Sequence, residues 1–170
     1  MRVWRLAKRR FARQLDGAGN RRTGARWNSP GRGLVYCSLC PSTCVLEAFV
    51  HLPPMLRRQL PEDFVFVELA LPAVPGWLFR RAGAAAALPA DLTLERSVTL
   101  PRRREAAARW QRRTGDDWLD RSGALFFLAP SAVVPLDWNV MLDPRHDSMK
   151  AVEVAGLHPF RFDERLVETY

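Results

Sequence analysis

Gly24-Ala25-Arg26-Trp27-Asn28 is the stretch around which the chain is organised. It forms a glycine-containing loop that carries an arginine, and two further polar side chains follow it. Tyr36 lies on a short apolar run, and Glu47 lies within an otherwise apolar segment. We expect a loop, a strand and a helix in this order, with the three side chains meeting in one pocket.

The segment that carries Glu47 predicts a helix over residues 42–52, which ends at Pro53-Pro54. At 100° per residue, apolar side chains cover most of its circumference, and only Cys44, Glu47 and His51 share the remaining stripe. That pattern is typical of a buried helix. A glutamate on a buried helix must be paired, neutral or exposed to a wet cavity, so Glu47 marks a candidate site.

Strands outnumber helices in the rest of the chain, and the two types do not alternate, which indicates an α+β fold. Strands are expected at residues 2–7, 34–37, 64–71, 124–128, 152–154 and 160–162, and a second helix at 102–113. Residues 72–100 read as an irregular connection with an Ala-rich turn at 83–87. Residues 114–119 read as a turn, and residues 137–139 lead to another turn at 142–146. No domain boundary is evident, so residues 1–170 are expected to form a single domain.

Composition favours a soluble cytoplasmic protein. The 170 residues include 48% hydrophobic and 26% charged residues, and no apolar run approaches the roughly 20 residues that span a bilayer. The N-terminal segment is too polar for a signal peptide, and three cysteines would not complete a disulfide framework.

The formal net charge of +8 suggests nucleic acid or an acidic partner. However, Lys8 and Lys150 are the only lysines, and the many arginines accompany many alanines, leucines and prolines, as a GC-rich coding sequence produces. The chain has no recognisable reading helix or aromatic-studded basic strand. A basic nucleic-acid-binding module is therefore the lowest-ranked alternative, while an acidic partner protein remains open.

Three cysteines and a histidine raise the question of a metal. Cys37, Cys40, Cys44 and His51 form the pattern C-x2-C-x3-C-x6-H, a ligand set that could hold zinc. Free cysteines at the end of a strand and within a helix are also ordinary packing residues. We expect no metal.

An ordered series of motifs extends over nearly the whole chain. They are Asp16–Gly19, Gly24–Gly31, Val35-Tyr36, Leu46–His51, Gly115–Leu119, Pro130–Pro135, Asn139–Pro144 with His146, and Pro159–Leu166. The series resembles the RES domain, the toxin half of a bacterial toxin–antitoxin pair. The arginine, glutamate and serine for which that family is named correspond to Arg26, Glu47 and Ser131. Ala25 replaces a glycine that is usual in the family, and residues 80–100 match no motif.

The resemblance implies a single RES domain with an ADP-ribosyltransferase-like fold, in which helices flank a central, split, mostly antiparallel sheet. It also implies an enzyme that consumes NAD by cleaving the nicotinamide–ribose bond and passes ADP-ribose to phosphate or water. The alternative is an ADP-ribosyltransferase that modifies a specific protein. The expected partner is an antitoxin with a helix-turn-helix DNA-binding part, which blocks the active site. A homodimer within that complex is left open, and neither a membrane nor direct nucleic-acid binding is expected.

The resemblance also suggests a role for each matching residue. Glu47 would stabilise the positive charge that develops on the ribose. Arg26, with Arg5 as a second candidate, would bind the pyrophosphate, and the ring of Tyr36 would pack on the nicotinamide. Ser131 would bond the carboxamide or Glu47.

Taken singly, these residues have ordinary structural explanations. Arg26 could be a surface charge, Tyr36 a core residue and Ser131 a turn hydroxyl, while Glu47 and His51 could form only an i, i+4 pair. His51 and Asn139 are assigned structural roles, Asn139 as a turn former.

Overall fold

Eight strands form one sheet in the computed structural model, which describes residues 1–53, 62–81, 88–101 and 104–166. They are β1 (Arg2–Lys8), β2 (Val35–Ser38), β3 (Phe64–Ala70), β4 (Gly76–Arg81), β5 (Leu94–Leu100), β6 (Phe126–Pro130), β7 (Trp138–Leu142) and β8 (Glu153–Phe160). Their order is β5-β4-β6-β7-β2-β1-β3-β8. Only the pairs of β4 with β5 and with β6 are parallel among those described. The predicted α+β class with a mostly antiparallel sheet is confirmed.

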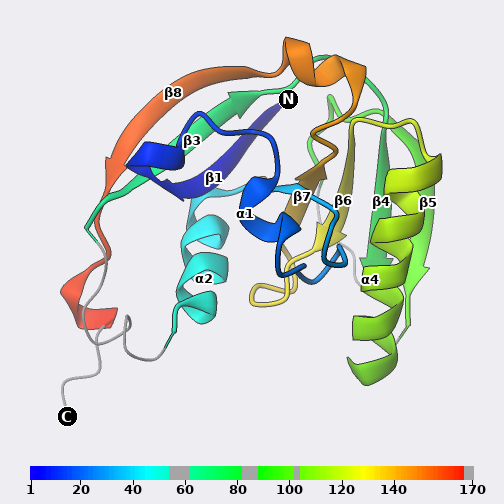
Figure 1. The fold of residues 1–170 in the computed structure, drawn as a ribbon, viewed down its shortest axis with the longest axis horizontal. Coiled ribbons are helices and arrows are strands. Elements are labelled where there is room, and N and C mark those ends of the chain that lie inside the picture. Colours follow the sequence, from blue (N-terminus) through cyan, green and yellow to red (C-terminus); the bar gives the residue numbers. More distant parts are fainter. Residues whose placement is uncertain (54–61, 82–87, 102–103, 167–170) are drawn as a thin grey trace.

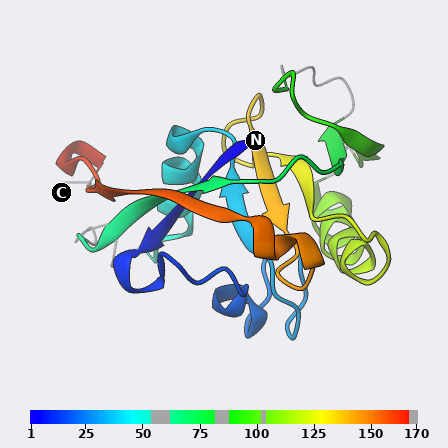
Figure 2. The same ribbon diagram turned by 90° about the horizontal axis from the view of Figure 1, so that it is seen from above.

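Helices pack against the inner strands of this sheet and near one of its ends. They are α1 (Ala18–Arg21), α2 (Pro41–His51) and α4 (Arg104–Arg121), with 3-10 turns at Arg9–Phe11, Asp147–Ala151 and Glu164–Leu166. Figure 1 shows α1 and α2 beneath the arch formed by β1, β3 and β8, with α4 beside β5. Seen from above in Figure 2, α2 and α4 lie on opposite sides of the central strands. No helix in the described part of the chain is long and apolar enough to cross a membrane.

The sheet is nearly divided between β1 and β2. These neighbours share a single register pair, Trp4 with Ser38, whereas β1 pairs with β3 along its whole length. Because β1 and β2 diverge beyond that pair, the sheet opens a gap near its middle. The split sheet expected from the resemblance is therefore present. Residues of both strands line a pocket at this gap.

The central strands are buried on both faces. The side chains of β6 and β7 alternate between two hydrophobic clusters, one on each face of the sheet. The first cluster contains Phe126, Leu128, Val140 and Leu142, and the second contains Phe127, Ala129 and Met141. The second cluster also holds Trp27, whose ring stacks on Phe79 at 5.3 Å and meets Phe127 edge-on at 5.1 Å. The loop that carries Arg26 is thereby fixed to the sheet through the neighbouring tryptophan.

Two of the predicted connections are strands. Residues 72–100 were expected to be irregular, but they contain β4 and β5, and residues 138–142 form β7 instead of leading into a turn. A strand buried on both faces lacks the alternation that marks a half-exposed strand, which explains the error at β7. The Ala-rich turn expected at 83–87 lies outside the described residues.

Helix α4 continues to Arg121, although a break was predicted at residues 114–119. Gly115 was read as a turn residue. Its actual role is close packing, because a Cβ atom at this position would lie 1.9 Å from the backbone oxygen of Trp27. The glycine therefore lets the helix approach the Arg26 loop.

Three smaller expectations also need correction. The strand expected at 124–128 is β6 at Phe126–Pro130, and the two short final strands are one strand, β8. Pro159 lies within β8, which is tolerated because β8 is an edge strand. Helix α2 is not buried all round, since Leu46 and Val50 are 38% and 41% exposed.

Candidate functional site

A cavity of about 740 Å³ lies where β1 and β2 diverge, a size typical of small-molecule sites. Its walls come from β1, the segment between β1 and β2, β2 itself, α2 and β7. The side chains that line it include Arg5, Arg26, Tyr36, Cys44, Glu47, His51 and Asn139. The predicted stripe of α2, Cys44 with Glu47 and His51, thus faces this cavity.

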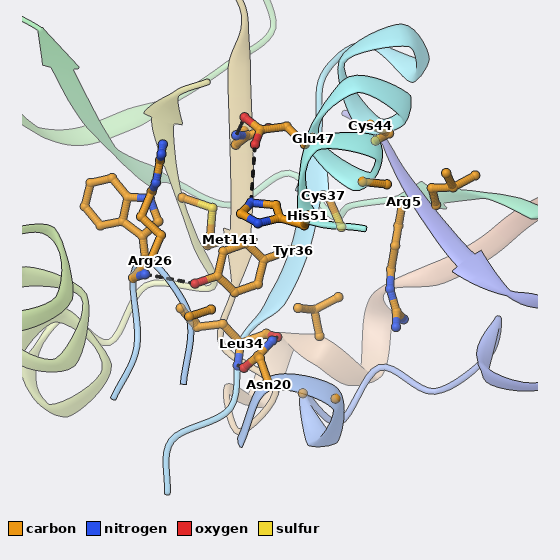
Figure 3. A pocket seen from close by; sticks show the side chains of 18 of the residues that line it. Arg5, Asn20, Arg26, Leu34, Tyr36, Cys37, Cys44, Glu47, His51 and Met141 are labelled. Atoms are coloured by element: carbon orange, nitrogen blue, oxygen red, sulfur yellow. Dashed lines mark hydrogen bonds and ion pairs between the residues drawn. The ribbon is translucent and has the colours of Figure 1, made fainter. Parts of the chain in front are cut away.

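Glu47 is held through one of its two carboxylate oxygens. Its Oε1 accepts hydrogen bonds from Ser131 Oγ at 2.7 Å, Asn139 Nδ2 at 2.7 Å and the backbone N–H of Ala132 at 3.0 Å. The other oxygen, Oε2, lies 4.0 Å from His51 Nε2 (Figure 3). Because the three donors collect on Oε1, the carboxylate is fixed in one orientation with Oε2 toward His51.

The surroundings of Glu47 favour its ionised form. Burial alone would raise its pKa, but the hydrogen bonds from Ser131, Asn139 and Ala132, together with the charge of Arg26, outweigh burial and lower the pKa. Glu47 is therefore a fixed negative charge at neutral pH.

Ser131 acts behind the carboxylate. It is completely buried, and its hydroxyl donates to Glu47 while accepting from the N–H groups of Val133 and Val134 at 3.1 and 3.0 Å. A serine hydroxyl has one donor and two acceptor positions, so this one is fully used. Of the two roles expected for Ser131, the geometry favours bonding Glu47.

Asn139, which the sequence assigned to a turn, contacts the candidate carboxylate. It lies on β7 opposite Ser38 of β2, and Ser38 Oγ donates to its Oδ1 at 2.6 Å. That bond orients the amide so that Nδ2 donates to Glu47. An asparagine inside the apolar run Trp138–Leu142 was the available signal, but the run was read as part of a turn.

Tyr36 offers its ring to the pocket because its hydroxyl is engaged elsewhere. The hydroxyl accepts from the backbone N–H of Trp27 at 3.0 Å and donates to Asn28 Oδ1 at 2.9 Å. Burial raises the pKa of Tyr36 well above its usual value, so the hydroxyl remains protonated. Asn28 is itself buried and donates to the Arg32 carbonyl at 2.7 Å. Tyr36 therefore anchors the loop that carries Arg26.

The loop accommodates Ala25 without strain. Gly24 has a φ of 70°, and a Cβ atom there would meet the Asn28 oxygen at 2.8 Å. Ala25 donates its N–H to that same oxygen at 2.9 Å, and no described residue other than glycine has a positive φ. The positive φ that requires glycine in this loop is therefore at residue 24, and residue 25 can be alanine.

The two candidate arginines lie in different parts of the pocket. Arg26 is exposed at the edge, where its charge acts to lower the pKa values of both Glu47 and Tyr36. Arg5 extends away from Glu47 in Figure 3 and donates through Nη1 to the Gln14 carbonyl at 2.6 Å. The structure brings Arg26, Tyr36 and Glu47 around one end of the cavity and places Arg5 farther along it.

Two of the three cysteines, Cys37 and Cys44, are buried. Cys44 Sγ donates to the Trp4 carbonyl at 2.9 Å, and burial raises its pKa to about 11. Cys37 is buried, and Cys40 Sγ lies 2.9 Å from Ser42 Oγ. Within the described ranges, no group of three or more His, Cys, Asp or Glu residues could hold a metal ion, so the zinc alternative gains no structural support.

Comparison with known proteins gives a consistent set of relatives. The family model described as the RES domain matches residues 2–163. The "Prs ADP-ribosylating toxin" of Sphingobium sp. is 28% identical over 96% of this chain and 95% of its own length. "Toxin Res" of Pseudomonas putida is 29% identical over 96% of this chain and 98% of its own length. The crystal structure of the M. tuberculosis MbcT-MbcA toxin-antitoxin complex contains a chain with a TM-score of 0.55 and 14% identity, covering 94% of this chain and 81% of that one.

Proposed function

Because this chain belongs to the RES domain family, we propose that it is the toxin of a toxin–antitoxin pair and that it cleaves the nicotinamide–ribose bond of NAD. The observation that carries the proposal is the carboxylate of Glu47. It is ionised, fixed through Oε1 by three donors, and set in the wall of a cavity of about 740 Å³.

The reaction requires such a carboxylate. When the bond between the ribose C1′ and the nicotinamide nitrogen breaks, its electron pair leaves with nicotinamide and positive charge develops on the ribose, as in glycoside hydrolysis. A fixed negative charge in a partly dry site stabilises this state without having to reorganise. Donors that hold the Glu47 carboxylate in place supply that preorganisation.

The remaining pocket residues suit the other parts of NAD. The guanidinium of Arg26 would bind the pyrophosphate as a fork of donors, and Arg5 would contact the part of the dinucleotide that extends along the cavity. The ring of Tyr36, with its hydroxyl turned toward Asn28, would pack on the nicotinamide. The pocket thus has a cationic, an aromatic and an anionic group for the three chemical parts of the substrate.

ADP-ribose would pass to phosphate or to water. A second candidate acceptor is a specific protein, which is favoured by the relative from Sphingobium, an ADP-ribosylating toxin. The two cases differ in product: the first yields a small phosphorylated or free ADP-ribose, and the second a modified protein.

The test is to incubate the purified protein with NAD and measure nicotinamide release with phosphate, without phosphate and with cell extract. We expect release by the wild type in at least one condition and strongly reduced release by Glu47→Gln. Equal release by the two proteins in every condition would contradict the proposal.

We also propose that an antitoxin with a helix-turn-helix part covers the pocket. One structural neighbour of this fold was solved as a toxin–antitoxin complex, and a formal net charge of +8 would suit an acidic partner segment. Co-expression with the product of an adjacent reading frame should yield a complex in which nicotinamide release is suppressed. Undiminished release from such a complex would contradict this part. The mass of the complex would also show whether it contains a homodimer.

A further inference from the structure

His51 occupies a distinctive place at the rim of the pocket. It is the last residue of α2, and its side chain is 73% exposed, yet it lines the cavity. Figure 3 shows its ring between Glu47 and Tyr36. The imidazole therefore contacts both solvent and the space in front of the carboxylate.

The distance from His51 to Glu47 leaves room for one atom. His51 Nε2 lies 4.0 Å from Glu47 Oε2, which is too long for a direct hydrogen bond. A single oxygen placed to one side of this line can lie within about 2.8 Å of both atoms. The donors that hold Glu47 all bond Oε1, so Oε2 faces this position.

We propose that His51 Nε2 and Glu47 Oε2 together bind the oxygen that attacks the ribose, and so form the acceptor subsite. The inference rests on the proposed NAD cleavage. The position of His51 at the rim indicates that it binds the acceptor of ADP-ribose and not NAD. NAD would fill the inner cavity between Tyr36 and Arg5, whereas a second reactant must arrive from solvent, where His51 is exposed.

In the proposed step one bond breaks, one bond forms and one proton is released. The C1′–nitrogen bond breaks and its electron pair leaves with nicotinamide, while the acceptor oxygen forms a new bond to C1′. The proton of that oxygen passes to neutral His51 Nε2 and then to solvent. The shared acceptor chemistry is an O–H group: water can donate one hydrogen to Oε2 and the other to Nε2, whereas the single hydroxyl of hydrogen phosphate donates to Nε2 alone. A histidine suits this role because imidazole is the side chain that most often acts as a general base in proton transfer.

The test compares His51→Ala and His51→Gln with the wild type. Nicotinamide release is measured at saturating NAD in two arms, one without phosphate and one across a phosphate titration, and NAD affinity is measured separately by calorimetry. We expect both variants to lose roughly 100-fold or more in rate, the usual size of a general-base contribution, while the Kd for NAD changes less than about twofold. A loss of rate in both arms would show that His51 takes the proton from water as well as from phosphate. A loss in the phosphate arm alone would identify phosphate as the acceptor that His51 serves.

A matched control comes from the other glutamate-paired histidine. His158 Nε2 lies 3.3 Å from Glu68 Oε2 on the sheet edge, away from the pocket, and His158→Gln should leave both rates unchanged. Wild-type rates in both His51 variants at saturating NAD, with any defect confined to lower NAD concentrations, would overturn the subsite while leaving NAD cleavage intact. If the wild type releases no nicotinamide, the proposed function fails and the subsite with it.

Discussion

Asn139 Nδ2 lies 2.7 Å from Glu47 Oε1, and this contact connects the middle of the sheet to the carboxylate of α2. Asn139 is oriented in turn by Ser38 on the neighbouring strand. The register of β2 and β7, which pairs these two residues, therefore sets the direction of the Glu47 side chain. The sheet, and not the helix alone, determines where the charge lies.

Asn139→Ala should lower activity and shift its pH dependence. The substitution removes a hydrogen bond to a charged group, worth about 1.5–3 kcal/mol, so the rate should fall roughly 10- to 100-fold. Asn139 helps to lower the pKa of Glu47, so its loss raises that pKa. As pH falls, the variant should then lose activity at a higher pH than the wild type. The pH–rate profile measures both effects, and an unshifted acid limb would contradict this role.

Ser131→Ala should lower stability in a pH-dependent way. The pKa of Glu47 is lowered in the folded protein, so its contribution to stability is present above its ordinary pKa and is lost as pH falls through the folded value. We expect the variant to lose about 1–3 kcal/mol in free energy of unfolding at pH 7, because a partly buried charged acceptor loses a donor. The difference from wild type should shrink in acid, where Glu47 is protonated. Denaturant unfolding at both pH values tests this, and a constant difference would argue against the linkage.

Tyr36→Phe should keep the aromatic ring but loosen the Arg26 loop. The change leaves the Trp27 N–H and Asn28 Oδ1 without the hydroxyl that bonds them both. Unpaired buried groups cost about 1–3 kcal/mol each, so we expect a lower free energy of unfolding together with weaker NAD binding. Calorimetric titration with NAD and denaturant unfolding measure the two effects. A fully stable Phe variant with normal affinity would show that the ring alone matters.

Gly115→Ala should destabilise the protein by about 1–3 kcal/mol, as overpacking usually does. The added Cβ atom would lie 1.9 Å from the Trp27 oxygen, so α4 and the loop must separate. Gly19→Ala is the control, because nothing lies within 4 Å of a Cβ atom there. Thermal unfolding of the two variants should differ clearly, and equal midpoints would contradict the packing role of Gly115.

The parts of the fold that follow local rules were predictable, and the parts set by packing were not. The helix around Glu47 and the strand after the Arg26 loop carry clear periodicity and turn signals. Gly115 looks like a helix breaker, yet it serves the approach of a distant backbone, which no local pattern records. Strand β7 is buried on both faces and lacks alternation, so Asn139 was placed in a turn and its bond to Glu47 was missed.

The central claim is that the charge of Glu47 drives cleavage of NAD. The most direct measurement is the rate of nicotinamide release by Glu47→Gln at saturating NAD, with NAD affinity measured on the same protein. Glutamine keeps the shape and an oxygen for the donors Ser131 and Asn139, so we predict near-normal binding and a rate reduced by about 100-fold or more. A variant that binds NAD and releases nicotinamide at the wild-type rate would contradict the account.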